Sequence, residues 1–236
     1  MSNDRSRLPS QPPASGDVAA FLERVAAMPA VTTAGQGRLL VGIDATASRQ
    51  ATWDTACHIQ SEMFAATGSL GGLAVRLCFY RGFNEFKATP WLSDPADLQR
   101  RMSRVVCAAG QTQIGRLLDH AAAQTRERKV QALVFVGDCV EEEAEPLYRK
   151  AGELGVLGVP CFLFQEGDDP VASKVFARIA DLTRGAHCRF DRNSAGQLKA
   201  LLGAVAVYAA GGRRALANYA RDKGGAAALL IGRMAP

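Results

Sequence analysis

The sequence lacks the paired cysteines and histidines that a zinc site or a thiol redox centre requires. Its 6 cysteines include no Cys-x-x-Cys pair, and its 3 histidines show neither zinc-type spacing nor a Ser-His-Asp order. We interpret the cysteines as buried free thiols in a reducing compartment, because most fall within segments expected to be strands or helices. They are Cys57, Cys78, Cys107, Cys139, Cys161 and Cys188.

Long hydrophobic runs are also missing. No apolar stretch approaches the roughly 20 residues that a membrane-spanning helix needs, so no membrane span is expected. Residues 1–13 are polar and contain proline without an apolar centre, which is not the pattern of a secretory signal. We therefore expect a cytoplasmic protein.

A clustered basic stripe with interleaved aromatic residues, typical of a nucleic-acid groove, is not found. The chain has 28 Lys and Arg against 23 Asp and Glu, a formal net charge of +5, but the cations are spread along it. A nucleic-acid partner is not expected. The excess charge serves either solubility or an acidic partner.

What is present is enough apolar material for one sizeable domain, since 48% of the 236 residues are hydrophobic. We expect a disordered tail over 1–15, a helix and linker over 16–37, the main domain over 38–210 and an extension over 211–236. The extension is basic at first and then briefly apolar. It is either a helix packed on the domain or a docking tail for another protein or a second copy.

Strand and helix patterns alternate through the main domain. This predicts an α/β fold, a three-layer doubly wound sheet that is mostly parallel, with one short antiparallel edge strand at 85–88. The other expected strands are 39–43, 72–80, 130–136, 159–164 and 187–190. The expected helices are 50–66, 94–110, one beginning at 112, 141–154, 172–182 and 197–209.

The stretch 39–48, Leu-Leu-Val-Gly-Ile-Asp-Ala-Thr-Ala-Ser, carries the main functional signal. An apolar run of this kind predicts a buried parallel strand, and its carboxyl end opens into a turn with Asp44, Thr46 and Ser48. Alternate residues of an extended turn point the same way, so three oxygen-bearing side chains can converge. Oxygen ligands suit a hard cation such as Mg²⁺. The alternative is that these residues only cap the following helix.

Two later segments extend the pattern. Residues 110–115 (Gly-Gln-Thr-Gln-Ile-Gly) place Thr112 in a loop that opens a helix, and residues 134–138 (Val-Phe-Val-Gly-Asp) form a second apolar strand ending in Asp138. The ordered set resembles the von Willebrand factor type A (VWA) family with its metal-ion-dependent adhesion site (MIDAS). Thr46 stands where that family often has Ser, and Gln111 and Cys139 stand beside the motifs where Gly is common.

The resemblance implies that five side chains hold one divalent cation, Mg²⁺ or Mn²⁺. They are Asp44, Thr46, Ser48, Thr112 and Asp138. It also implies a protein-binding module in which a partner supplies an Asp or Glu carboxylate to the metal. With the cytoplasmic location expected above, we predict an intracellular module, for which residues 211–236 are a candidate docking element.

Other candidates have simpler interpretations. Glu141, Glu142 and Glu143 are expected in the first turn of the helix 141–154, where acids stabilise the helix dipole. Asp54 and His58 are one helical turn apart, which fits metal ligation but is more often structural. Trp53 is expected to be a packing residue. His120 and His187 belong to no motif.

Two other functions stay open. Strand-Asp-x-Thr with a later strand-Gly-Asp resembles haloacid-dehalogenase-type phosphatases, in which an aspartate attacks phosphorus and Mg²⁺ is bound. That family expects a second aspartate at the place of Thr46, so no complete catalytic constellation is present and we do not expect an enzyme. The third possibility is a metal-independent scaffold whose tails carry the interaction.

Overall fold

The computed structural model describes residues 24, 36–51, 53–54, 72–190 and 195–222. Its centre is a 6-stranded sheet with the order β3-β2-β1-β4-β5-β6. The strands are β1 (Gly37–Asp44), β2 (Leu73–Arg81), β3 (Glu85–Ala88), β4 (Ala132–Gly137), β5 (Cys161–Glu166) and β6 (Ala186–Phe190). Every neighbouring pair is parallel except β2 and β3, which are antiparallel. The expected fold class is confirmed, including the antiparallel edge strand at 85–88.

Burial explains why the apolar runs form the middle of the sheet. Every residue of β1, β4 and β5 is buried. Strands covered on both faces cannot alternate apolar with polar residues, which is why they are read from the sequence as continuous apolar runs. The edge strand β3 has no fully buried residue, as expected where one side faces solvent.

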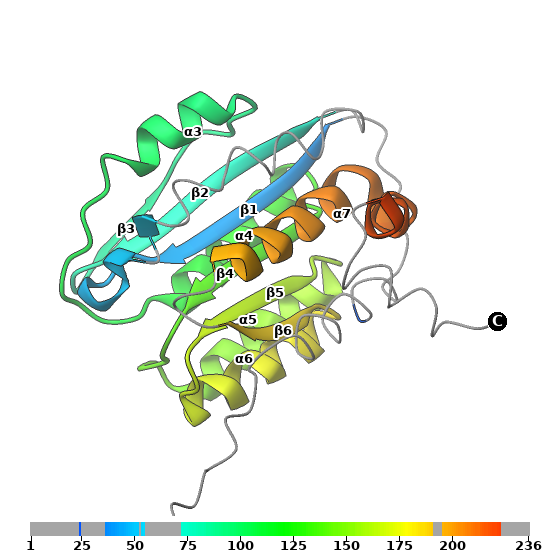
Figure 1. The fold of residues 1–236 in the computed structure, drawn as a ribbon. Coiled ribbons are helices and arrows are strands. Elements are labelled where there is room, and N and C mark those ends of the chain that lie inside the picture. The colour runs from blue at the N-terminus through cyan, green and yellow to red at the C-terminus, as the bar shows by residue number, and fades with distance from the viewer. Residues whose placement is uncertain (1–23, 25–35, 52, 55–71, 191–194, 223–236) are drawn as a thin grey trace, which may run out of the picture.

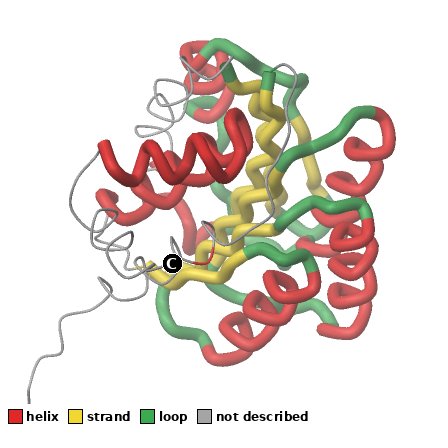
Figure 2. Tube along the Cα trace, turned by 90° about the vertical axis from the view of Figure 1, so that its right-hand side faces the viewer, coloured by secondary structure: helices red, strands yellow, loops and turns green. Residues whose placement is uncertain are grey.

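Helices cover both faces of the sheet (Figures 1 and 2). One face packs against α4 (Ile114–Glu127), α5 (Ala144–Val156) and α6 (Pro170–Leu182), through Leu40 of β1 and its equivalents. The other face packs against α3 (Pro95–Met102) and α7 (Ala195–Asp222), through Leu39 and Val41. A short 3₁₀ helix, η1 (Ala47–Arg49), follows β1. The result is a three-layer α/β structure.

The last helix lies very close to the start of the sheet. A Cβ atom on Gly37 would lie 2.3 Å from the carbonyl oxygen of Ala209, so only glycine allows α7 to approach β1 here. Helix α7 is interrupted at Gly212, whose φ of 68° is not helical, and the basic segment after it is helical up to Asp222. This kink falls next to the boundary expected at 210; the domain limits themselves stay a prediction.

Several helix boundaries differ from expectation. Helix α4 begins at Ile114 instead of 112, and α7 spans Ala195–Asp222 instead of 197–209. Helix α3 ends at Met102 instead of continuing to residue 110, because the chain leaves it to pair with the turn after β1, where the Ala108 amide donates to the Ala45 carbonyl at 3.0 Å. Helix α5 begins at Ala144, so Glu141 and Glu142 precede it. Most of the expected helix 50–66, residues 1–23 and the extension beyond 222 lie outside the described residues.

The order of the strands creates a switch point between β1 and β4. Chain connections run in opposite directions from β1, since β2 lies on one side of it and β4 on the other. In open α/β sheets, the crevice outside the carboxyl ends of the strands at such a point is where ligands bind. We call the edge of the sheet at the carboxyl ends of β1, β2, β4 and β5 the carboxyl rim. None of the helices in the described part of the chain has the length and hydropathy that a membrane crossing requires.

Candidate metal-binding site at the carboxyl rim

Asp44 is the last residue of β1 and is 0% exposed. Its Oδ1 accepts a hydrogen bond from the Thr46 amide at 2.8 Å, and its Oδ2 accepts one from the Tyr80 hydroxyl at 3.3 Å. Burial raises the pKa of Asp44, partly offset by hydrogen bonds from the Thr46 backbone and side chain and by the charge of Arg49. Asp44 is therefore an oriented carboxylate whose ionised form lacks solvation, which a bound cation would stabilise.

The turn after β1 carries the other two members of the first motif. Thr46 is buried and precedes η1 with an extended backbone, and its side chain hydrogen-bonds Asp44. The Thr46 side chain makes no capping hydrogen bond to η1. Its role in this turn is therefore not that of a cap for η1. The backbone of Ser48 lies in η1, while its side chain lies outside the described part.

Asp138 directly follows β4, the strand next to β1, in which Val136 pairs with Ile43. Its charge raises the pKa of Asp44, so the two carboxylates are electrostatic neighbours. The adjacent Cys139 thiol has a pKa raised to about 12, chiefly by burial and then by Asp138. Cys139 is thus a protonated thiol near neutral pH and not a reactive thiolate.

Thr112 is fixed by a reciprocal pair of hydrogen bonds with Glu141. The Thr112 amide donates to Glu141 Oε2 at 2.9 Å, and the Glu141 amide donates to Thr112 Oγ1 at 3.0 Å. This pair joins the loop before α4 to the segment after β4, which contains Asp138. Thr112 is 4% exposed and sits two residues before α4, not in its first turn.

Glu142 provides the N-terminal cap of α4. Its carboxylate accepts from the Ile114 amide at 2.5 Å and from the Gly115 amide at 2.8 Å. The expectation that residues 141–143 stabilise their own helix is wrong for Glu141 and Glu142: they serve the helix that Thr112 precedes. The cause is tertiary, because α4 and α5 pack side by side and bring the two helix starts together.

Arg49 and Glu166 belong to this region and were missed from the sequence. Arg49, the last residue of η1, has a fully buried side chain that forms an ion pair with Glu166 at the end of β5. Arg49 Nη1 also lies 4.0 Å from Asp138 Oδ2. The available signals were an arginine immediately after Asp-x-Thr-x-Ser and an acid at the carboxyl end of another apolar strand.

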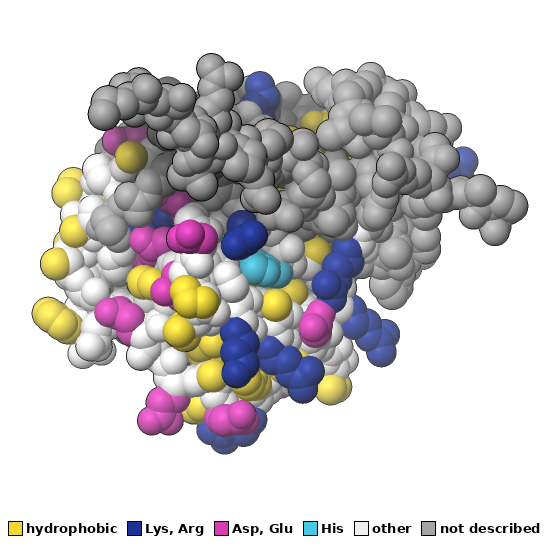
Figure 3. Space-filling view, turned by 60° about the horizontal axis from the view of Figure 1, so that its bottom comes forward, with side chains coloured by type: hydrophobic (Ala, Val, Ile, Leu, Met, Phe, Trp, Pro, Cys, Tyr) yellow, Lys and Arg dark blue, Asp and Glu magenta, His cyan; other side chains and the backbone are white. Residues whose placement is uncertain are grey.

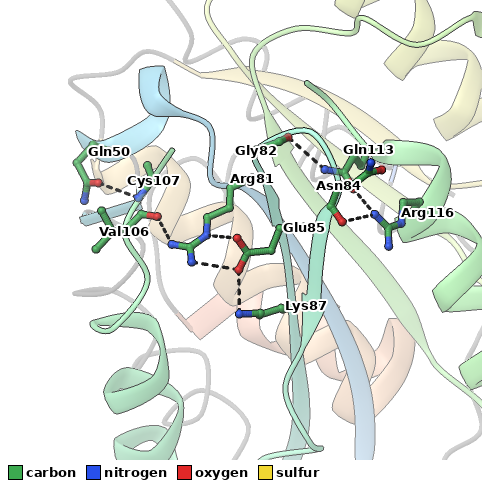
Figure 4. A network of polar contacts seen from close by, with 10 residues as sticks. All are labelled: Gln50, Arg81, Gly82, Asn84, Glu85, Lys87, Val106, Cys107, Gln113 and Arg116. Carbon is green, nitrogen blue, oxygen red and sulfur yellow. Dashed lines mark hydrogen bonds and ion pairs between the residues drawn. The ribbon is translucent and has the colours of Figure 1, made fainter. Parts of the chain in front are cut away.

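The loops around the rim are held together by a polar network (Figure 4). Arg81 donates from Nε to Glu85 Oε2 at 2.8 Å and from Nη1 to the Val106 carbonyl at 2.5 Å. The Gly82 carbonyl accepts from the Gln111 amide at 3.2 Å. A Cβ atom on Gly110 would lie 2.1 Å from the Gly82 carbonyl oxygen, so glycine permits this contact. The turn after β2 and the loop before α4 therefore form one continuous surface.

Two apolar side chains project from this surface. Phe83, in the turn between β2 and β3, is 74% exposed, and Val106, in the loop before α4, is 65% exposed. The hydrogen bond from Arg81 to the Val106 carbonyl places both segments beside each other. Two further apolar side chains, Val156 and Val171, are exposed elsewhere, so exposure alone does not mark a contact surface.

The donor set of the rim fits a hard dication. Asp44 and Asp138 supply two carboxylates, and Thr46 and Thr112 supply buried hydroxyls, all of them oxygen. Within the described residues, no group of three or more His, Cys, Asp and Glu side chains is arranged as a metal site. Mg²⁺ and Mn²⁺ are the ions that such oxygens favour.

The remaining candidates are structural where they are described. Trp53 is 1% exposed and donates from Nε1 to the Met102 carbonyl at 3.0 Å, which confirms it as a packing residue. Asp54 accepts from Gln50 Nε2 at 2.8 Å, and His58 lies outside the described residues. The His187 ring is 3.0 Å from Gln165 Oε1, and His120 packs against Phe86 at a ring distance of 5.6 Å.

Comparisons with known proteins point to one fold. No family model and no curated protein sequence matches the chain. Among solved structures, the VWA domain of SpRpn10 aligns with a TM-score of 0.55 and 13% identity, covering 72% of this chain and 95% of that one. An aerotolerance-related membrane protein from Bacteroides fragilis aligns with a TM-score of 0.53 and 17% identity, covering 70% and 96%.

A third similar structure has metal in its site. Proximal thread matrix protein 1 from the mussel byssus, with a zinc-occupied MIDAS motif, aligns with a TM-score of 0.56 and 16% identity, covering 73% of this chain and 46% of that one. At these identities the likeness concerns the fold alone. The chain has the fold of VWA domains, as the sequence resemblance implied.

Proposed function

We propose that the chain is a divalent-metal-dependent protein-binding module of the VWA type. The observation that carries the proposal is the buried Asp44 carboxylate, oriented by Thr46 and Tyr80, with Asp138 beside it at the switch point of the sheet. Asp44 is buried and Asp138 is half-buried beside it, and a dication is a favourable partner for two carboxylates placed in this way. Mg²⁺ or Mn²⁺ is the ion that the oxygen donors favour.

The residues that would hold the cation are the five in the sequence motifs. They are Asp44, Thr46, Ser48, Thr112 and Asp138. The bound metal would supply a Lewis-acidic position for an outside carboxylate. The chain itself orients Asp44 through Thr46 and fixes Thr112 through Glu141. Because much of the set is hydroxyl, the two carboxylates offset the dication without leaving excess negative charge to repel a partner's Asp or Glu.

The apolar surface beside the site indicates what kind of partner would dock. Phe83 and Val106 lie on loops tied to the turn that carries Asp44, through the contact of Ala108 with Ala45 and that of Arg81 with Val106. A partner segment with an acidic residue close to an apolar one would meet both features. The SpRpn10 VWA domain and the mussel protein have the same fold as this chain. The zinc in the MIDAS motif of the mussel protein supports the proposal that a metal binds at the carboxyl rim.

The test is isothermal titration of Mg²⁺ and Mn²⁺ into the wild-type chain and into Asp44→Ala. We expect saturable binding by the wild type and loss of at least about a hundredfold in affinity for Asp44→Ala, since a directly bound carboxylate is removed. Asp119→Ala is the matched control, because Asp119 is an exposed acid on α4 paired with Lys150. Equal heats for wild type and Asp44→Ala would contradict the proposal.

A pull-down from lysate with and without chelator extends the test to the partner. Capture that is lost on chelation and with Asp44→Ala, but kept with Asp119→Ala, is the expected result. Capture that persists with chelator would favour a metal-independent scaffold instead. The observation that favours this second candidate is Arg49, a built-in cation close to Asp138.

A further inference from the structure

Arg49 is unusual for a charged residue in this protein, because its side chain is entirely buried. It forms an ion pair with Glu166, whose side chain is only 2% exposed, and Nη1 lies 4.0 Å from Asp138 Oδ2. Within the described residues, Nε and Nη2 are buried without a hydrogen-bond partner. Burying a guanidinium costs desolvation free energy unless ion pairs and hydrogen bonds offset it. The position of Arg49 next to the candidate metal site therefore needs an explanation.

The contacts of Arg49 connect three strand ends. It follows the turn of β1, its ion-pair partner Glu166 ends β5, and Asp138 follows β4, which lies between them. The charge of Arg49 also acts on Asp44. Glu166 therefore holds a fixed positive charge against the two carboxylates that would bind the cation.

We propose that Arg49, held by Glu166, is the internal counter-ion of Asp138, and that a divalent cation binds the rim in competition with it. This proposal rests on the metal-binding function proposed above. It adds that the Arg49–Glu166 pair sets the affinity of the carboxyl rim for the divalent cation. Arg49 contacts Glu166 more closely than Asp138, so Glu166 limits how far the guanidinium neutralises Asp138 and leaves that carboxylate able to bind a dication. Removing the charge of Glu166 alone leaves one uncompensated positive charge near the metal position.

The experiment compares Glu166→Gln with the double variant Arg49→Gln/Glu166→Gln by Mg²⁺ titration, with far-UV circular dichroism to verify folding. Glu166→Gln should weaken Mg²⁺ binding by roughly tenfold or more, because one unit charge now repels the dication at close range. The double variant removes the competing guanidinium together with the carboxylate that holds it and should bind Mg²⁺ more tightly than the wild type. Asp119→Asn, which removes an exposed carboxylate paired with Lys150, should leave the affinity unchanged.

Each outcome decides between this proposal and the function on which it rests. Equal affinities of Glu166→Gln and wild type, or a double variant that binds no more tightly than the wild type, would overturn the role of Arg49 while leaving the metal site intact. Binding by the double variant with none by the wild type would support Arg49 as a competitor and contradict metal dependence of the natural chain. If neither the wild type nor any variant binds Mg²⁺, both the metal-binding function and the role of Arg49 are overturned. If Glu166→Gln alone does not fold, the double variant still decides: tighter Mg²⁺ binding than the wild type supports the proposal, and equal or weaker binding overturns it.

Discussion

At the amino ends of the strands, Arg38 and Arg76 lie beside Trp91; at the carboxyl ends, Asp44 and Asp138 lie beside Arg49. The Arg38 guanidinium is 3.9 Å from the Trp91 ring centre. Figure 3 shows the same polarity on one face: Asp and Glu side chains gather toward the side where β1 ends in Figure 1, and Lys and Arg side chains toward the other side.

The two ends satisfy their charges differently. Around Trp91, Arg38 donates to the Arg128 carbonyl, while Arg76 Nη1 and Trp91 Nε1 both donate to Gln124 Oε1, at 2.6 and 3.0 Å. These are neutral acceptors that complete a structural cluster. At the carboxyl rim, burial and to a smaller extent Asp138 raise the pKa of Asp44, and Arg49 lies between Glu166 and Asp138. The difference teaches that neutral oxygen acceptors hold the arginines at the amino end, whereas acidic side chains share one buried arginine at the carboxyl rim.

The largest expected effect at the amino end is on stability. Trp91→Ala removes a half-buried ring, its cation–π contact with Arg38 and its bond to Gln124, and should lower the free energy of unfolding by about 2–3 kcal/mol. Trp91→Phe keeps an aromatic ring for Arg38 but loses the Nε1–H donor to Gln124, and should cost about 1 kcal/mol. Urea unfolding measures both. Mg²⁺ affinity should be unchanged, and a changed affinity would break the separation between the two ends.

A smaller and more specific effect is expected from the cap of α4. Glu142→Ala should cost about 1 kcal/mol, because the amides of Ile114 and Gly115 lose their acceptor. It should also weaken Mg²⁺ binding, since the start of α4 positions Thr112. Glu143→Ala removes the same charge next to it, but Glu143 makes no side-chain cap bond to α5, so its effect on both quantities should be small. Equal losses for the two variants would show that charge alone, and not the cap, matters.

The smallest expected effect is the pH dependence of stability from His120. Burial lowers the pKa of His120, with a further contribution from Arg76, so the unfolded chain binds its proton more readily than the folded one. Stability is therefore fully present above the ordinary histidine pKa of about 6.5 and is lost as pH falls below it toward the lowered folded value. His120→Gln should reduce the pH dependence of the urea midpoint between about pH 7 and 5, because the group that binds a proton on unfolding is removed. An unchanged slope would contradict this assignment.

Much of the fold could be predicted from the sequence, because strands that are buried on both faces of the sheet consist of continuous apolar residues. The runs at β1, β4 and β5 were placed within two residues of their observed ends. The short edge strand was predicted from its turn. The end of α3 was not, because a loop contact to Ala45 decides where that helix stops, and no local pattern encodes such a contact.

The candidate site was predicted in part. Asp44, Thr46 and Asp138 were chosen as candidates because they follow apolar runs that predict strands. In the structure the two aspartates are close enough for the charge of Asp138 to raise the pKa of Asp44. Glu166 was not identified, because an acid at the end of a distant strand gains meaning only when the strand order places it beside Arg49. The assignment of the five side chains to one cation stays a prediction.

The sequence by itself determined the alternation of strands and helices and the acids that end two of the strands, because these depend on local periodicity and on residues adjacent in the chain. Tertiary structure alone decided that Glu142 caps α4 and that Arg49 faces Asp138 and Glu166. The physical reason is that these partners are joined by packing of the sheet and its helices, so their interaction does not exist until segments far apart in the chain have come together.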